Sequence, residues 1–302
     1  MSFSRIFVLG AGAIGSIYGA LLSQKNDVTL IGNKAHVDVV NSKGLSISGD
    51  INQTFHLKAE TEICGIPENT LIILTTKAYD SAKAIEKTKR LFKKDTAILV
   101  LQNGLGNEEI VKRAAGDKAE ILRGITTMAT EFFEPGKIRF WSGETIIERN
   151  ELAKRVAEIF CGCRLKTRLS DDISEEVWNK LVVNCVINPL SALLRVRNSE
   201  LVSDLLKTVR HGIVSECVEV GKAERMAFPE GLEEEVDEKI SSYTNFSSMC
   251  QDIMKGKKTE IDFLNGKVVE LGRKHHIATP VNETLVCLVK WLEEKNAIPR
   301  KN

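Results

Sequence analysis

The sequence lacks the features that would assign it to several specialised classes. Its 302 residues include 42 lysines and arginines against 41 aspartates and glutamates, so it has none of the basic excess typical of nucleic-acid-binding proteins. No uninterrupted apolar run reaches the roughly 18 residues of a membrane span. The N-terminus passes from a short apolar start into glycine-rich turn chemistry, unlike a signal peptide. We therefore expect a cytoplasmic protein with neither a nucleic-acid nor a membrane partner.

Cysteine and histidine occur without the spacing of a disulfide framework or a metal site. The seven cysteines are odd in number and form no C-x-x-C pair, which favours reduced thiols packed as small apolar side chains. The five histidines are scattered, and the adjacent His275 and His276 have no suitably spaced third ligand. We expect no bound metal.

Two different periodicities of apolar residues divide the sequence into two parts. Residues 1–168 alternate short apolar runs with amphipathic helical patterns, which predicts a mostly parallel sheet covered by helices on both faces. A hairpin is expected near residues 44–58, and the far sheet edge near residues 124–148 should be antiparallel or mixed. The predicted strands are Ile6–Leu9, Val28–Ile31, Leu71–Thr75, Ala97–Leu101 and Thr145–Glu148.

The second half shows helical periodicity alone, so residues 169–302 are predicted to form an all-α domain. Pro229 and Pro280 stand at element ends, as expected of residues that lack an N–H. The expected helices cover residues 173–194, 199–226, 231–243, 246–254, 258–276 and 281–295.

A Gly-x-Gly-x-x-Gly motif follows the first strand and opens the first helix. Glycines at this spacing permit a tight turn, close approach of the backbone to a pyrophosphate and packing of the helix on the strand. The helix N-terminus then offers free N–H groups and a positive dipole end. The alternative is a plain tight turn. The candidate dinucleotide contacts are Gly10, Ala11, Gly12, Ala13, Ile14 and Gly15.

The end of the second strand bears on the choice of nicotinamide cofactor. An NAD site usually places a carboxylate there to bind the ribose 2′-hydroxyl. Here Asn33 and Lys34 occupy the position, and an amide with a cation suits a 2′-phosphate. The pattern favours NADP(H) and leaves NAD(H) open, because Lys34 is also explained as a solvated lysine at a helix start.

Two more strand ends carry polar residues. Lys77 follows the third parallel strand and Asn103 follows the fourth. Ligands of open α/β sheets bind outside the carboxyl ends of the strands, so both are candidate cofactor contacts. An exposed lysine at a helix cap and an ordinary asparagine–glycine turn are the competing interpretations.

A polar row interrupts the apolar helix expected at residues 173–194. Lys180, Asn184 and Asn188 are spaced four apart and therefore share one helix face. Burying an unpaired ammonium is costly, so the row is expected to line a cleft, where the lysine supplies charge and a proton. The alternative is that Lys180 extends to solvent and the amides cap neighbouring elements. Pro189 predicts that the helix kinks or ends there.

Several motifs together resemble the ketopantoate reductase family over nearly the whole chain. They are the N-terminal glycines, Lys77, the segment Gln102-Asn103-Gly104, the segment 181-LVVNCVINPL-190 and the segment 247-SSMCQDIMKGKKTEIDFLNG-266. The resemblance implies a Rossmann domain, then an all-helical domain of the 6-phosphogluconate dehydrogenase type, with the active site between them. It also implies reduction of 2-dehydropantoate with NADPH, on the pathway to pantothenate and coenzyme A.

The same resemblance implies a role for each matching residue. Lys180 takes the place of the proton donor, and Glu260 that of the acid near the lysine and the cofactor. Read alone, Glu260 would be a surface carboxylate at a helix start. The implied substrate contacts are Asn184, Asn188, Asn198 and Ser248. Asn103 would touch both substrate and cofactor, and Lys77 and a residue near Thr130 would contact the cofactor.

This chain departs from the family pattern at one point, because Asn33-Lys34 stands where many members carry arginine. Two rival functions stay open: another keto-acid or hydroxyacid dehydrogenase of the same architecture, and a non-catalytic NADP(H)-binding sensor. A homodimer is compatible with the sequence, although no residue specifies one.

Overall fold

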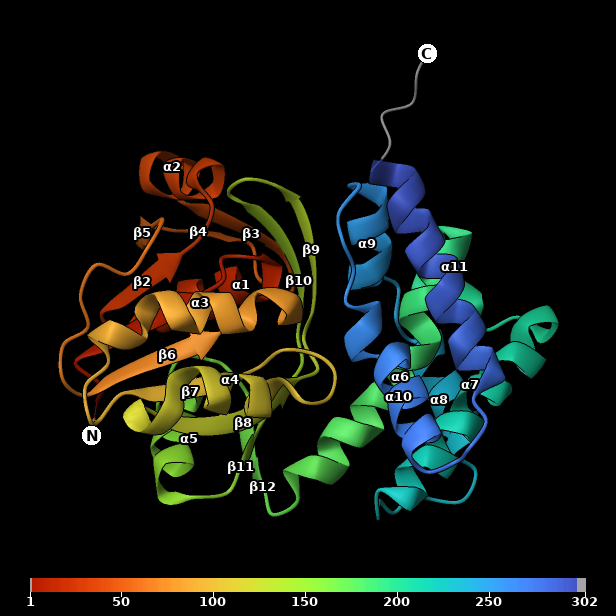
Figure 1. Ribbon diagram of the computed structural model, residues 1–302. Helices are drawn as coiled ribbons and strands as arrows, with labels where there is room; N and C mark the ends of the chain where they lie inside the picture. The colour runs from red at the N-terminus through yellow and green to blue at the C-terminus, as the bar shows by residue number, and fades with distance from the viewer. Residues whose placement is uncertain (1, 298–302) are drawn as a thin grey trace. The chain divides into compact units, whose positions relative to one another are not determined.

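The computed structural model describes residues 2–297, which form two compact units (Figure 1). Unit 1 comprises Met1–Gln102 and Gly106–Ile173, and unit 2 comprises Asn103–Leu105 and Ser174–Asn302. The short segment Asn103–Leu105 therefore belongs by its contacts to the C-terminal unit. The boundary expected at residue 168 falls within the last strand, β12 (Thr167–Ser170), and the extent of each folding domain stays a prediction.

An eight-stranded sheet forms the centre of unit 1 in the described residues, in the order β12-β11-β8-β7-β6-β1-β2-β5. The strands from β8 to β5 are parallel to their neighbours, whereas β11 pairs antiparallel with β8. This confirms the predicted mixed edge. The strands are β1 Arg5–Leu9, β2 Val28–Ile31, β5 Lys58–Glu60, β6 Thr70–Leu74, β7 Ala97–Val100, β8 Glu120–Thr126 and β11 Thr145–Glu148.

A second, four-stranded sheet has the order β4-β3-β10-β9. Its strands are β3 Leu45–Gly49, β4 Gln53–Phe55, β9 Ala129–Glu134 and β10 Lys137–Trp141. The antiparallel β3–β4 pair confirms the expected hairpin. The parallel pairing of β10 with β3 was not predicted.

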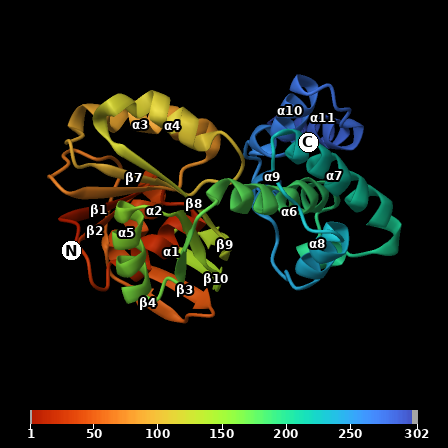
Figure 2. The same cartoon turned by 90° about the horizontal axis from the view of Figure 1, so that it is seen from below.

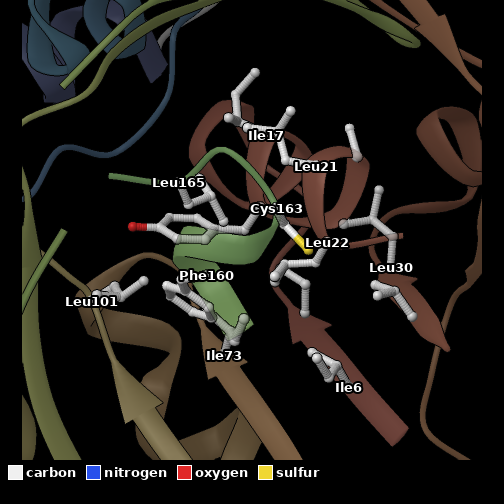
Figure 3. Packing of buried hydrophobic residues seen from close by; sticks show 14 of the residues in the cluster. Ile6, Ile17, Leu21, Leu22, Leu30, Ile73, Leu101, Phe160, Cys163 and Leu165 are labelled. Carbon is white, nitrogen blue, oxygen red and sulfur yellow. The ribbon is translucent and has the colours of Figure 1, made fainter. Parts of the chain in front are cut away.

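Helices cover both faces of the large sheet, because each buried strand is apolar on both sides. In β1, Ile6 and Val8 pack into one cluster while Phe7 and Leu9 pack into another. Helices α3 and α4 cover the second face, and α1 and α5 lie across the first (Figure 2). Figure 3 shows part of the first cluster, in which the Phe160 ring of α5 packs against the Tyr18 ring of α1 with 5.4 Å between the ring centroids. The helices of unit 1 are α1 Ala13–Leu22, α2 Lys34–Lys43, α3 Ser81–Thr88, α4 Asn107–Ala115 and α5 Glu151–Gly162, with 3-10 turns η1 Ala78–Asp80, η2 Lys89–Leu91 and η3 Gly116–Lys118.

Within its described residues unit 2 is helical, as predicted. Helix α6 (Ile173–Leu194) runs through its core, with every residue from 181 to 192 buried. Its bounds match the predicted range of residues 173–194, and of the kink or end expected at Pro189 the end does not occur, because α6 continues beyond it. The other helices are α7 Asp204–Ala223, α8 Leu232–Ser241, α9 Ser248–Met254, α10 Asn265–Lys274 and α11 Pro280–Ala297, with turns η4 Asn198–Leu201 and η5 Ile261–Phe263.

Among the described residues, α6 is also the one helix long and apolar enough to cross a membrane. The core helix of a globular protein passes the same test of length and composition. Because 78% of the relevant window is buried inside the structure, α6 is better explained as a core helix.

Candidate active site and cofactor loop

The glycine loop of unit 1 has the geometry of a phosphate cradle. Gly10 has a φ of +118°, and a Cβ atom there would lie 2.4 Å from the Thr76 nitrogen. A Cβ on Gly15 would lie 2.1 Å from the Gly10 carbonyl oxygen, so α1 packs tightly on the turn. In contrast, a Cβ on Gly12 would meet no atom within 4 Å. The loop therefore leaves open space directly before the N-terminus of α1, and its residues fit a dinucleotide pyrophosphate.

Asn33 and Lys34 each have a structural contact at the end of β2. The Asn33 Oδ1 atom accepts a hydrogen bond from the His36 backbone N–H at 3.0 Å and so caps α2. The Lys34 Nζ atom pairs with Asp38 one helical turn later at 2.9 Å, and its side chain is 81% exposed. The structure places both residues at the strand tip, and their contact with a 2′-phosphate stays a prediction.

The other predicted cofactor residues lie at different places in the fold. Lys77 immediately precedes η1, close after the end of β6. Thr130 lies on β9, opposite Phe140 in the four-stranded sheet. Neither position assigns a ligand contact by itself.

A buried arginine that was not predicted from the sequence holds the turn after β7. Arg123 is 3% exposed, and its guanidinium donates to the Val100 and Gln102 carbonyl oxygens, each at 3.0 Å. Its Nε atom lies 3.3 Å from a carboxylate oxygen of Glu108. The Gln102 amide in turn donates to the Thr76 carbonyl at 3.1 Å. This buried cluster fixes the backbone that leads into Asn103, and a lone arginine in a strand gave no sequence signal of it.

The polar row of α6 is brought into contact with the predicted Asn103. Lys180 is half-buried, and its Nζ atom donates to the Asn103 Oδ1 atom at 2.7 Å. Hydrogen bonds from an ammonium are stronger than neutral ones, so Asn103 fixes the position of the Lys180 charge. The spacing of the row therefore identified Lys180, and Asn103, from a distant part of the sequence, provides its hydrogen-bond partner.

Asn103 also lies beside the segment that carries Glu260. The Leu105 N–H donates to the Phe263 carbonyl oxygen at 3.2 Å, and the Phe263 N–H donates to the Glu260 carbonyl oxygen at 3.0 Å. A Cβ on Gly104 would lie 2.2 Å from the same Phe263 oxygen, so only glycine permits this approach. Glu260 is 8% exposed, which replaces the surface carboxylate interpretation with a buried one.

Two amides, one in the row and one in η4, each have a buried polar atom without a hydrogen-bond partner among the described residues. Asn184 is 8% exposed and its Nδ2 atom makes no hydrogen bond within residues 2–297. Asn198 is 1% exposed, and its Oδ1 atom likewise accepts no hydrogen bond within residues 2–297. Buried polar atoms normally have a hydrogen-bond partner. A donor and an acceptor that lack one are therefore suited to bind a polar ligand.

The remaining predicted substrate contacts lie where α6 meets α9. The Asn188 Oδ1 atom accepts from the Ser248 hydroxyl at 3.3 Å and from the Met249 N–H at 3.4 Å. Asn198 is tied to the segment before α9, because its N–H donates to the Asn245 carbonyl oxygen at 3.1 Å. The structure thus pairs Lys180 with Asn103 and Asn188 with Ser248.

Arg210 anchors the turn η4 that carries Asn198. Its guanidinium is 2% exposed and donates to the Leu201 carbonyl oxygen at 2.6 Å. It also donates to both carboxylate oxygens of Asp237, and these hydrogen bonds lower the pKa of that carboxyl below its ordinary value. Asp237 therefore stays ionised and holds Arg210 in place.

Comparisons with known proteins match both halves of the chain. The family described as ketopantoate reductase PanE/ApbA matches residues 6–151, and its C-terminal counterpart matches residues 172–293. A 2-dehydropantoate 2-reductase of Pyrococcus horikoshii is 38% identical over 96% of this chain and 97% of its own length. An Archaeoglobus fulgidus protein of the same name is 32% identical over 97% and 99%.

Solved structures show the same architecture. A PanE/ApbA family ketopantoate reductase from Ralstonia eutropha has a TM-score of 0.90 at 28% identity, covering 97% of this chain and 100% of its own. D-mandelate dehydrogenase with NADH and anilino(oxo)acetate has a TM-score of 0.89 at 29% identity, with the same coverage.

A dinucleotide-type glycine loop and a separate helical unit with a lysine–asparagine row define a two-domain oxidoreductase of the Rossmann type, which confirms the predicted fold class. Within that class, the chain belongs to the ketopantoate reductase family.

Proposed function

We propose that the protein reduces 2-dehydropantoate (ketopantoate) to (R)-pantoate with NADPH, and that NADH also serves. The observation that carries the proposal is the Lys180–Asn103 contact of 2.7 Å, one helical turn from the buried Asn184 Nδ2 atom, which has no hydrogen-bond partner among residues 2–297. Family membership and the relatives named 2-dehydropantoate 2-reductase support the substrate. The reaction belongs to pantothenate and coenzyme A biosynthesis, and we place the protein in the cytoplasm.

The chemistry follows from the side chains of the row. A nicotinamide dinucleotide held by the glycine loop of unit 1 would supply the hydride for the C2 carbonyl of the substrate. Lys180 stabilises the negative charge that builds on the carbonyl oxygen, and its Nζ atom then donates the proton that completes the hydroxyl. Asn103 keeps that ammonium in place. Glu260, which is buried, takes the role that the family resemblance implies, the acid near the lysine and the cofactor.

The amides and the hydroxyl of the site would orient the substrate. Asn184 offers an Nδ2 donor and Asn198 an Oδ1 acceptor, which suit the carboxylate and 4-hydroxyl of ketopantoate respectively. Ser248 donates a hydrogen bond to Asn188, which places the one hydroxyl of the set beside the third amide. Fixing both ends of the substrate exposes one face of the carbonyl and sets the configuration of the product.

Replacing Lys180 with alanine tests the proposed acid. Removing a general acid lowers turnover by roughly 10²–10⁴-fold. We therefore expect kcat of Lys180→Ala to fall in that range while cofactor affinity, measured by fluorescence titration, stays unchanged. The matched control is Lys207→Ala, which removes an exposed lysine of α7. Near-wild-type turnover of Lys180→Ala would show that this lysine is not the proton donor.

A related 2-keto acid is the second candidate substrate, because D-mandelate dehydrogenase shares the architecture at 29% identity. Steady-state rates with ketopantoate and with the keto acid that corresponds to mandelate separate the two. The proposal requires a clearly higher kcat/KM for ketopantoate.

A solved relative from Staphylococcus aureus is described as dimeric, which supports a homodimer here, and light scattering tests it.

A further inference from the structure

Helix α6 contains a defect in the middle of its polar row. Pro189 lies inside the helix and has no N–H, so the carbonyl oxygen of Cys185, four residues earlier, loses its usual helical donor. Cys185 is fully buried, so water does not replace that donor. An interior proline normally kinks or ends a helix, yet α6 continues to Leu194.

Asn265 supplies the missing hydrogen bond. This first residue of α10 is fully buried, and its Nδ2 atom donates to the Cys185 carbonyl oxygen at 2.9 Å. The same amide nitrogen donates its second hydrogen to the Asn282 Oδ1 atom at 2.8 Å. Both donors of the amide are therefore used, and one of them replaces the donor that Pro189 lacks.

A buried chain of hydrogen bonds holds the Asn265 amide in that orientation. The Asn282 Nδ2 atom donates to the Glu216 carboxylate at 2.7 Å. That carboxylate also accepts the backbone N–H groups of Val281 at 2.8 Å and Asn282 at 2.9 Å, in the first turn of α11. A carboxylate at a helix N-terminus is favourable, which stabilises Glu216 in its buried position. The chain links α6 to α7, α10 and α11.

The position of the defect decides its consequence for the site. Cys185 lies between Asn184 and Asn188, so a bend at this carbonyl would rotate Asn188 away from the face that carries Asn184 and Lys180. Asn188 in turn accepts hydrogen bonds from Ser248 and the Met249 N–H. The hydrogen bond from Asn265 therefore acts on the part of α6 that sets the relative orientation of the two row amides.

We propose that Asn265 is a positioning residue for the reaction: its side-chain amide keeps α6 continuous across Pro189 and so holds Asn184 and Asn188 on one substrate-binding face. The inference rests on the proposed function, since it assigns Asn265 a role in orienting the substrate of that site.

Four chains test the proposal: the wild type, Asn265→Ala, Pro189→Ala and the double variant. Loss of one hydrogen bond corresponds to roughly a tenfold change in an equilibrium constant. We expect KM for ketopantoate to rise about tenfold in Asn265→Ala, with kcat reduced less and cofactor affinity unchanged. Pro189→Ala restores a backbone donor to the Cys185 carbonyl, so the double variant should return to a KM close to that of Pro189→Ala alone.

The control separates positioning from stability. Val268→Ala removes a fully buried side chain of the same α10 and keeps the amide, so it should lower the melting temperature without changing KM. An unchanged KM in Asn265→Ala, or a double variant with the elevated KM of Asn265→Ala, overturns the proposal. If Asn265→Ala does not fold, the double variant tests the proposal instead. The proposal requires the double variant to fold and to bind substrate.

Failure of the proposed function is visible separately. A folded wild-type chain that binds cofactor but does not reduce ketopantoate contradicts the function, whatever the variants do. Thermal unfolding of the same four chains still measures the coupling of Asn265 to Pro189. Additive changes in melting temperature would show that the amide does not replace the missing donor.

Discussion

At the scale of single residues, the three loop glycines have different physical reasons to be glycine. Gly10 has a positive φ and lies against the Thr75–Thr76 backbone. Gly15 lies against the Gly10 carbonyl and so lets α1 pack on the turn. Gly12 has an ordinary φ of −77° and open space around the position of a Cβ. The fold therefore requires glycine at positions 10 and 15, whereas at Gly12 it does not, and we propose that the open space there receives a ligand.

Alanine substitutions at two of these positions should separate those roles. Gly12→Ala should keep the free energy of unfolding within about 1 kcal/mol of the wild type. Its affinity for nicotinamide cofactor should fall at least about tenfold, because the new methyl group occupies the cradle. Gly15→Ala should instead lose about 1–3 kcal/mol through overpacking. Thermal unfolding and fluorescence titration measure both quantities, and normal cofactor affinity in Gly12→Ala would refute the assigned cradle.

Lys34 should determine the preference between the two nicotinamide cofactors. Its ion pair with Asp38 is exposed and therefore weak, so the ammonium is available to a 2′-phosphate. We expect Lys34→Ala to raise KM for NADPH about tenfold and to leave KM for NADH unchanged. Asp38→Ala is the control and should retain NADPH preference. Equal effects of Lys34→Ala on both cofactors would remove the lysine from the phosphate site.

At the scale of elements, a buried histidine connects two helices with a hairpin. The Gly136 N–H in the β9–β10 turn donates to the His36 Nδ1 atom at 3.1 Å, so this nitrogen is unprotonated. The opposite ring nitrogen then carries the hydrogen and donates to the Ser16 hydroxyl of α1 at 3.1 Å. Burial lowers the pKa of His36 below its ordinary value, which favours this neutral form.

This contact predicts a loss of stability in mild acid. The unfolded ring titrates near pH 6.5, whereas the folded ring titrates lower. The unfolded chain therefore binds the proton first, so the contribution of His36 is complete above about pH 6.5 and declines as the pH falls towards the folded pKa. Melting temperatures across this range should fall less in His36→Gln than in the exposed control His56→Gln. Parallel curves for both variants would contradict the prediction.

Long, regular elements could be predicted from the sequence, whereas short polar ones could not. Helix α6 and strand β2 match the predicted ranges, because their apolar residues extend over the whole element. Strands β5 and β12 span only three and four residues of mixed polarity, too few to show a period. The pairing of β10 with β3 joins segments far apart in sequence, and no local pattern encodes it.

The candidate site was predictable where one helix face contains it. The spacing of Lys180, Asn184 and Asn188 identified the row, the end of the fourth strand pointed to Asn103, and the family motifs added Ser248. The contact of Asn103 with Lys180 and the support of Cys185 by Asn265 depend on tertiary packing. The continuation of α6 beyond Pro189 has the same origin, since local sequence does not show that a distant amide replaces the missing donor.

At the scale of the whole molecule, each unit contributes separate chemistry. Unit 1 presents a glycine cradle at the N-terminus of α1, and unit 2 presents the row of α6 with Asn103. Relatives named 2-dehydropantoate 2-reductase span nearly the full chain. The same architecture also serves D-mandelate dehydrogenase, so the substrate must be tested on this protein itself.

The most direct test of the account is nicotinamide oxidation, followed by absorbance, with ketopantoate and either NADPH or NADH. The account predicts rapid oxidation that depends on ketopantoate, with NADPH preferred. Oxidation of NADH alone would keep the reductase and contradict the role of Asn33 and Lys34. No oxidation of either cofactor by a folded, cofactor-binding chain would contradict the central claim that this protein reduces ketopantoate.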